Sequence, residues 1–284
     1  MGGQVAMDGT SRTAAGITGR TRVYGIVADP IYHVKAPEVM GALFARHGID
    51  GVLVPLHVPP DGLPALMDGL RHLRNFGGFI ATVPHKTAMT GLCDAITREA
   101  EQIGAVNCVR READGRMVGT MLDGVGFVEA LRASGVEPRG RSAALAGAGG
   151  AASAIAFALA EAGVARLTIL NRTADKARAL AERLRAAYPD LTVAAEGAQA
   201  DHDLLVNGTS LGMRAGDAAP FDLAALHAGQ FVAEAIMDPE TTPLLAAASA
   251  AGCRVQKGLP MLECQIALMA RHMGALSGAL PDAG

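Results

Sequence analysis

The sequence contains no tryptophan, and aromatic residues make up only 4% of its 284 residues. No apolar run approaches the ~18 residues that a helix needs to cross a bilayer, so no membrane segment is predicted. The formal net charge is −3 and the basic residues are scattered, which excludes the positive surface typical of nucleic-acid binding. The expected partner is a small-molecule substrate, and the sequence leaves both a monomer and a homodimer open.

Paired cysteines are also lacking. The 4 cysteines are widely spaced, and none lies in a CxxC pair or beside a histidine at metal-ligand spacing. This pattern favours reduced, buried thiols in a cytoplasmic protein and indicates no metal site. Residues 1–20 are small and polar without the apolar segment of a secretory signal, so we expect a flexible leader there.

What the chain does contain is a regular alternation of strand-like and helix-like segments. Half of its residues are hydrophobic, with 35 glycines, a composition that suits parallel strands alternating with helices. Apolar runs predict strands over residues 23–29, 51–58 and 78–83, and Asp114-Gly115 predicts a hairpin. Helical spacing is found after Pro37 and over residues 63–73, and a further helix is predicted over 125–133.

A second α/β unit begins near residue 141. Predicted strands at its start and at 166–173 flank an alanine-rich helix, and the charged segment 174–188 is a further helix. We therefore predict an α/β protein of two domains, over residues 21–124 and 125–258, followed by a last helix over 259–284.

A glycine-rich turn carries the first functional signal. Gly147, Gly149 and Ala152 match the dinucleotide fingerprint G-x-G-x-x-G/A, with an additional glycine at Gly150. Glycines allow a tight turn and let backbone N–H groups approach a pyrophosphate at the helix start. An apolar strand precedes the turn and a helix follows it, which is the context that the fingerprint requires.

The next strand ends in residues that discriminate between the two nicotinamide cofactors. Asn171, Arg172 and Thr173 stand where an NAD site carries Asp or Glu, and Lys176 follows one helical turn later. Cations and a hydroxyl suit a 2′-phosphate, so the sequence predicts NADP. The alternative is an ordinary solvated helix start.

Isolated polar residues in apolar surroundings form the second signal. Thr82 and Lys86 end the third strand, Asn107 lies within an apolar stretch, Asp123 follows another, and Gln265 lies on the last helix. Each has a simpler explanation: Asp123, for example, could N-cap the following helix. Together with a nucleotide turn they favour a ligand cleft, because ligands of open α/β sheets bind at the carboxyl ends of strands.

The sequence resembles the shikimate dehydrogenase family. The segments "TVPHK", "GAVN", "DGVGF", "GAGGAA", "NRT", "NGTSLGM", "TPLL" and "MLECQ" occur in that family's order between Val23 and Leu276. The resemblance implies a substrate-binding domain over 21–124, completed by the C-terminal helix over 259–284, and a Rossmann-type NADP-binding domain over 125–258, with the active site in the cleft between them. It also implies reversible, NADP-linked oxidation of a ring hydroxyl of shikimate or a close cyclic analogue. It implies that Lys86 and Asp123 are the catalytic pair and that Thr82, Asn107, Asp123 and Gln265 bind substrate. The implied cofactor residues are Gly147, Ala148, Gly149, Gly150, Ala151, Asn171, Arg172, Thr173, Lys176, Thr209, Ala235 and Gly258.

Several positions depart from the family pattern around the substrate. Val34 and Ala36 replace two serines whose hydroxyls hold the substrate carboxylate in the family. Other polar residues are replaced by Ile80, Met121, Leu122 and Met237. Either Tyr32, His33 or Lys35 reaches the carboxylate instead, or the substrate is less polar or quinate-like. The residues assign no role to His85.

These residues are also compatible with two other functions. The departures are compatible with a non-catalytic, NADP-binding regulatory module, which would bind NADP without turnover. A folate-linked dehydrogenase shares the general architecture, but only an analogy of fold supports it.

Overall fold

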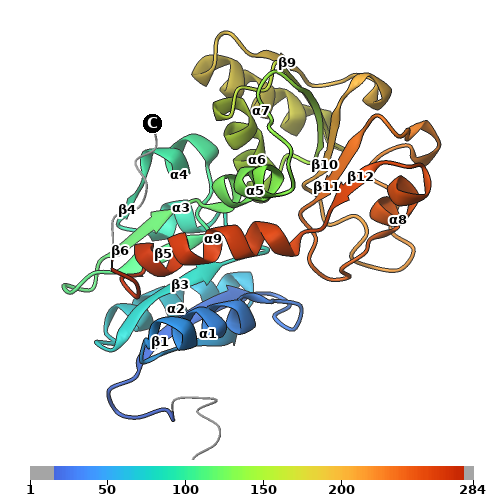
Figure 1. Cartoon of the computed structure of the whole chain (residues 1–284). Helices are drawn as coiled ribbons and strands as arrows, with labels where there is room; N and C mark the ends of the chain where they lie inside the picture. The colour runs from blue at the N-terminus through green and yellow to red at the C-terminus, as the bar shows by residue number, and fades with distance from the viewer. Residues whose placement is uncertain (1–15, 278–284) are drawn as a thin grey trace, which may run out of the picture.

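The computed structural model describes residues 16–277. Most of the predicted leader and the last seven residues of the predicted C-terminal segment lie outside this range. The described chain forms two six-stranded sheets, one from each half of the sequence, with helices packed around them (Figure 1). The predicted α/β architecture is confirmed.

The first sheet is mixed. Its strands are β1 (Arg22–Ala28), β2 (Gly51–His57), β3 (Phe76–Ala81), β4 (Ala95–Ile96), β5 (Cys108–Arg111) and β6 (Met117–Thr120), in the spatial order β2-β1-β3-β5-β6-β4. β1 pairs in parallel with β2 and β3, whereas β5 is antiparallel to β3 and to β6. The hairpin predicted around Asp114-Gly115 is the β5–β6 connection.

The second sheet is entirely parallel. Its strands are β7 (Ser142–Ala146), β8 (Arg166–Leu170), β9 (Thr192–Ala194), β10 (Leu204–Asn207), β11 (Phe231–Glu234) and β12 (Arg254–Gln256), in the order β12-β11-β10-β7-β8-β9. The order changes direction next to β7, which places a topological switch point at the carboxyl ends of β7 and β10.

The helices are α1 (Ala36–His47), α2 (Leu63–Arg71), α3 (Met89–Leu92), α4 (Arg98–Ile103), α5 (Asp123–Ala133), α6 (Gly150–Glu161), α7 (Ala174–Ala187), α8 (Pro243–Ala250) and α9 (Leu259–His272), with short 3₁₀ turns at Pro60–Gly62, Gln199–Asp201 and Leu223–Ala225. The longer helices follow the predicted apolar periodicity, whereas α3 and α4 were not predicted. The N-cap residue of α1 is Lys35, which makes no side-chain cap hydrogen bond, and this costs ~1 kcal/mol relative to a capped helix.

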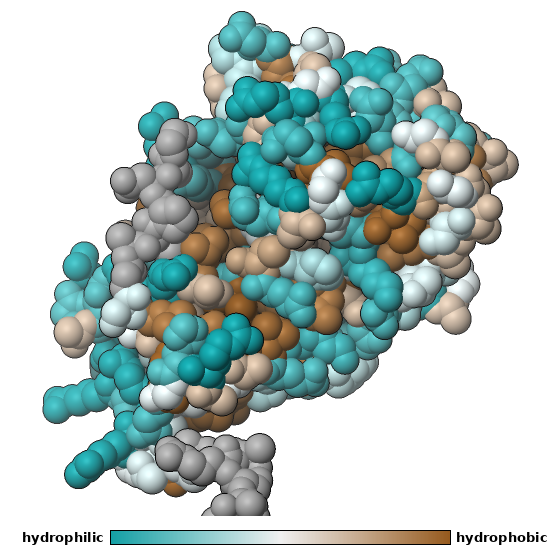
Figure 2. All heavy atoms as spheres, viewed as in Figure 1, coloured by the Kyte–Doolittle hydropathy of each residue, from teal (hydrophilic) through white to brown (hydrophobic). Residues whose placement is uncertain are grey.

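The last helix returns to the first sheet. α9 follows β12 of the second sheet, yet it packs against α5, α1 and β5, and Figure 1 shows it lying between the two sheets. α5 in turn packs against both α9 and α6. One apolar cluster runs from Phe79 through Phe127 to Ile155, so the two halves share a continuous core. On the face drawn in Figure 2, apolar residues are exposed in the band between the two halves.

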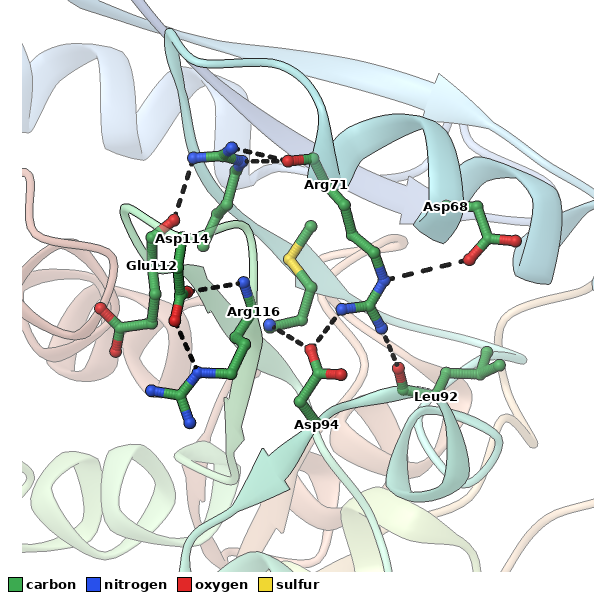
Figure 3. A network of polar contacts seen from close by, with 9 residues as sticks. Asp68, Arg71, Leu92, Asp94, Glu112, Asp114 and Arg116 are labelled. Atoms are coloured by element: carbon green, nitrogen blue, oxygen red, sulfur yellow. Dashed lines mark hydrogen bonds and ion pairs between the residues drawn. The ribbon is translucent and has the colours of Figure 1, made fainter.

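Arginines fasten the β5–β6 hairpin to the end of α2 (Figure 3). Arg111 donates from Nε and Nη2 to the Arg71 carbonyl at 2.9 and 2.6 Å. The Arg71 guanidinium pairs with Asp94, and this hydrogen bond lowers the pKa of the Asp94 carboxyl. Asp94 also accepts from the Met117 backbone N–H at 2.6 Å, so one carboxylate joins α2 to β6.

Two details differ from the sequence-based expectation. The third strand was predicted to include Val83, but β3 ends at Ala81 and the Val83 side chain is 56% exposed. Val83 lies past the last paired residue of β3 and lines the cavity described below, so its apolar character does not reflect burial in the sheet. The short elements α3, β4 and α4 were not predicted, because segments of two to six residues give no readable periodicity.

No helix within residues 16–277 is both long enough and apolar enough to cross a membrane.

Glycines in α5 permit its close packing, and this generates a stability prediction. A Cβ on Gly126 would lie 2.5 Å from the Met261 carbonyl oxygen of α9, which is backbone and cannot rotate away. We expect Gly126→Ala to lower the free energy of unfolding by about 1–3 kcal/mol, measured by urea denaturation. Gly41→Ala on α1 is the matched control: a Cβ there meets nothing within 4 Å. It should raise stability by about 0.5–1 kcal/mol. Equal stability of the two variants would contradict this account of the α5–α9 contact.

Candidate active site

A cavity of about 430 Å³ lies between the two sheets. Its walls come from the carboxyl end of β3 and the start of α1 on one side. On the other side are the turn before α6 and the segments after β10 and β11, and α9 contributes as well. Ligands of such sheets usually bind at the carboxyl ends of parallel strands, so the strand topology alone predicts a ligand site in this cavity.

A lysine and an aspartate meet at this cavity. Lys86 Nζ donates to Asp123 Oδ2, and the two side chains are 14% and 5% exposed. The Lys86 backbone is held by the Val106 N–H, which donates to its carbonyl at 2.9 Å. Asp123 is the first residue of α5, where the positive end of the helix dipole favours a carboxylate. Its side chain caps nothing, so the simpler explanation of Asp123 as an N-cap is wrong: that position is Leu122.

Two buried amides complete the environment of Asp123. Asn107 Nδ2 donates to Asp123 Oδ1 at 2.7 Å, and Gln265 Nε2 donates to the same oxygen at 3.5 Å. Asn107 Nδ2 also lies 3.3 Å from Gln265 Oε1, and its Oδ1 accepts from the Leu122 N–H at 2.9 Å. These contacts join the segment before β5, the start of α5 and α9. Thr82, which follows β3, lines the same cavity.

His85, to which the sequence assigned no role, is fully enclosed beside Lys86. Its side chain is 1% exposed, and Nε2 lies 2.9 Å from the Val58 carbonyl, which accepts from the neutral ring. Burial lowers the pKa of His85. The imidazole therefore anchors the turn that carries Lys86 onto the end of β2, and it does not face the cavity as a charged group.

The glycine fingerprint stands directly across from Lys86. Gly147 has φ +114°, and a Cβ there would lie 3.1 Å from both Ala152 Cβ and the Gly208 backbone, so only glycine fits. α6 begins at Gly150, where an added Cβ would lie 3.3 Å from Lys86 Cβ. The predicted turn residues Gly147, Ala148, Gly149, Gly150 and Ala151 all line the cavity. Backbone N–H groups at this helix start are thus a few ångströms from the lysine.

A second recess, of about 1150 Å³, adjoins the first through Asn171 and Thr209, which line both. Arg172, a predicted cofactor residue, lines it, and so does Arg178 of α7, which the sequence reasoning did not single out. Thr173 is the N-cap residue of α7 and Lys176 lies on its exposed side; neither contributes to the lining.

The remaining predicted cofactor positions, Thr209, Ala235 and Gly258, follow β10, β11 and β12. Ala235 lines the cavity. Gly258 is not among the lining residues, and a Cβ there would come within 2.2 Å of the Ile236 carbonyl oxygen. Thr209 Oγ1 donates to Asn207 Oδ1 at 2.7 Å, which fixes the segment after β10.

A buried glutamate that the sequence did not single out supports these segments. Glu234, at the end of β11, is 0% exposed. One of its oxygens accepts from the Ala235 and Ile236 backbone N–H groups at 3.0 and 3.1 Å. The other accepts from Asn207 Nδ2 at 3.1 Å and Thr242 Oγ1 at 3.0 Å. Burial outweighs these donors and raises the pKa of Glu234 to about 7. A charged residue inside the run "FVAEAI" is the signal that could have identified it.

The positions that depart from the family pattern separate into two groups. Val34, Ala36, Ile80 and Met237 line the cavity. Met121 and Leu122 are buried in the apolar clusters instead, at 3% and 7% exposure.

A nucleotide-type glycine turn that faces a buried lysine–aspartate pair across one cavity defines the class, a two-domain α/β oxidoreductase. The similarity of this chain to known proteins agrees with this class. Residues 26–109 match the family described as "Shikimate dehydrogenase substrate binding domain", and residues 131–211 match "Shikimate / quinate 5-dehydrogenase". The shikimate dehydrogenase (NADP(+)) of Rubrobacter xylanophilus is 43% identical over 94% of this chain and 95% of its own length. The chain belongs to the shikimate dehydrogenase family.

Solved structures show the same fold. The Thermus thermophilus shikimate 5-dehydrogenase, in complex with NADP(H) and shikimate, has a TM-score of 0.80 and 34% identity, covering 93% of this chain and 96% of that chain. The ligand-free 5-ketofructose reductase of a Gluconobacter species has a TM-score of 0.78 and 32% identity, covering 89% and 93% respectively.

Glu234 generates a pH prediction. Because its pKa in the folded protein lies above the ordinary value of 4.5, the folded state retains a proton that the unfolded state loses. Its contribution to stability is therefore full below pH 4.5 and declines until about pH 7, by roughly 3 kcal/mol in total. Relative to Glu234→Gln, which does not titrate, the wild type should lose stability between pH 5 and pH 8 in urea denaturation.

The control for this prediction is Glu240→Gln. Glu240 forms an exposed pair with Lys257, which lowers the pKa of the Glu240 carboxyl and keeps it ionised throughout this range. The stability difference between this variant and the wild type should stay constant from pH 5 to pH 8. A constant difference for Glu234→Gln as well would overturn the assignment of the titration to Glu234.

Proposed function

We propose that the protein is an NADP-dependent oxidoreductase that reversibly transfers hydride between NADP(H) and a ring hydroxyl or ketone of shikimate/3-dehydroshikimate or a close cyclic analogue. The observation that carries the proposal is the buried Lys86–Asp123 pair facing the Gly147–Ala151 turn across one cavity. The names of the curated relative and of the Thermus structure support it, since these proteins are shikimate dehydrogenases with NADP.

The residues present fit NADP. The turn with Gly147 at positive φ would hold the pyrophosphate, and the adjoining recess, with Arg172 and Arg178, would hold the 2′-phosphate. When bound, the cofactor supplies the acceptor or donor of hydride. The three positions directly after β8 carry no acidic side chain to bind a free 2′-OH, because residues 171–173 are Asn-Arg-Thr.

Side chains of the protein itself transfer the proton. As the substrate carbon gives up its hydride, the hydroxyl proton must leave, and the Lys86 amine accepts it. Asp123 holds the amine in place and compensates the ammonium that results. In the reverse direction Lys86 returns the proton to the carbonyl oxygen. Thr82, Asn107 and Gln265 position the ring hydroxyls around this pair.

In this proposal the two domains have different binding roles. Residues 21–124 with the last helix bind the substrate, and residues 125–258 bind the cofactor. A cytoplasmic location and a monomer or homodimer remain predictions from the sequence.

Lys86→Ala tests the proposed chemistry. Loss of the acid–base group should lower kcat for NADP reduction by about 10²–10⁴-fold, measured with shikimate, quinate and uncharged cyclic polyols, while the protein stays folded by circular dichroism. Thr87→Ala is the matched control, since Thr87 is exposed next to Lys86. Equal rates for Lys86→Ala and the wild type would refute the role of Lys86. NADP binding without turnover of any substrate would instead favour a regulatory module.

Cofactor preference is tested separately at Arg172. Arg172→Ala should lower kcat/KM for NADP by roughly tenfold, the effect of losing a phosphate partner of about 1.4 kcal/mol, and leave kcat/KM for NAD unchanged. Parallel assays with NADP and NAD measure the ratio. A wild-type preference for NAD, or an unchanged ratio in the variant, would contradict the assignment of the second recess to the 2′-phosphate.

A further inference from the structure

The substrate-facing side of the cavity combines hydrogen-bond acceptors with apolar side chains. We infer that the natural substrate is an uncharged polyhydroxy ring alcohol or its ketone, without the carboxylate that shikimate carries. This inference rests on the proposed function and specifies the substrate class of the same site.

The apolar wall is continuous with the core of the first domain. Ile80, Leu262 and Met269 belong to one buried cluster and also line the cavity, and Val34 and Met237 pack against that cluster. These residues come from β3, α9, the loop before α1 and the loop after β11. A substrate face that contacts this wall gives up water without gaining polar partners, which favours uncharged groups and disfavours a carboxylate.

The polar side of the cavity is organised around the Asp123 carboxylate. Asn107 Nδ2 donates to Asp123 Oδ1 at 2.7 Å and to Gln265 Oε1 at 3.3 Å, and Gln265 Nε2 donates to the same Asp123 oxygen at 3.5 Å. Asp123 and Thr82 both line the cavity. A substrate hydroxyl can donate to the Asp123 carboxylate, whereas a substrate carboxylate cannot donate to it and is repelled by its charge.

The cavity is also electrically balanced. Its charged lining consists of two lysines, Lys35 and Lys86, and two aspartates, Asp123 and Asp238. Burial lowers the pKa of His33, the one histidine of the lining, so its ring is neutral near pH 7. Lys86 is paired with Asp123. Lys35 is therefore the one cation among the described lining residues that could meet a substrate carboxylate.

Three matched substrates test the inference with the purified full-length chain and NADP. They are shikimate, its methyl ester and the corresponding primary alcohol, which keep the ring hydroxyls and differ in charge at one end. We expect kcat/KM to be about tenfold or more higher for the neutral compounds than for shikimate, because the carboxylate loses its hydration without fixed donors. Shikimate turned over as well as or better than the neutral compounds overturns the inference and leaves the proposed function intact.

Variants at the apolar wall and at Lys35 make the test sharper. Val34→Ser with Ala36→Ser adds two hydroxyl donors and should shift the preference toward shikimate by about tenfold, whereas Val34→Ala, which adds none, should not. Lys35→Gln should change the acid and the neutral compounds alike; a selective loss of shikimate turnover would show that Lys35 binds a carboxylate and would overturn the inference. Turnover of none of the compounds above the Lys86→Ala level would refute the proposed function and the inference with it.

Discussion

The site depends on one buried carboxylate. Asp123 accepts hydrogen bonds from Lys86, Asn107 and Gln265, which arrive from three separate parts of the chain. A carboxylate at 4% exposure is stable only with such partners, and its position at the start of α5 adds the favourable helix dipole. Losing Lys86 would leave the Asp123 charge buried without a counter-ion. The same contacts that stabilise Asp123 therefore also fix the orientation of the lysine amine.

The second half of the chain uses a buried carboxylate in a different way. Glu234 binds four donors, none of them a cation, and joins the segment after β10 to the segment after β11. Both segments line the cavity, so the position of the wall opposite Lys86 depends on Glu234. Asp123 is stabilised by charge, whereas Glu234 is held by dipoles alone, and this difference explains why burial raises the pKa of Glu234.

Most of the fold could be predicted from the sequence, because long periodic segments such as 150–161 and 174–187 and the apolar strands leave little ambiguity. The glycine fingerprint and the isolated Lys86, Asp123 and Gln265 also pointed to the site. Other features depend on tertiary geometry that no local pattern encodes. Val83 resembles a strand residue but lies past the last paired residue, and Lys176 resembles a cofactor ligand but lies outside the recess lining. Glu234 was missed because a single acid within an apolar run has no motif.

The position of α9 has a consequence for the order in which the chain folds. The apolar cluster under the first sheet includes Tyr24 and Phe44 near one end of the sequence and Leu262, Ile266 and Met273 near the other. During synthesis α1 can cover part of this face of the first sheet, but the rest stays exposed until more than a hundred further residues, including the whole second sheet, have been added. The second sheet draws its strands from one contiguous stretch and has no such delay. The domain that is synthesised first is therefore completed last. Its long-range contacts carry a loop-closure entropy cost, and its apolar surface can aggregate until α9 is in place.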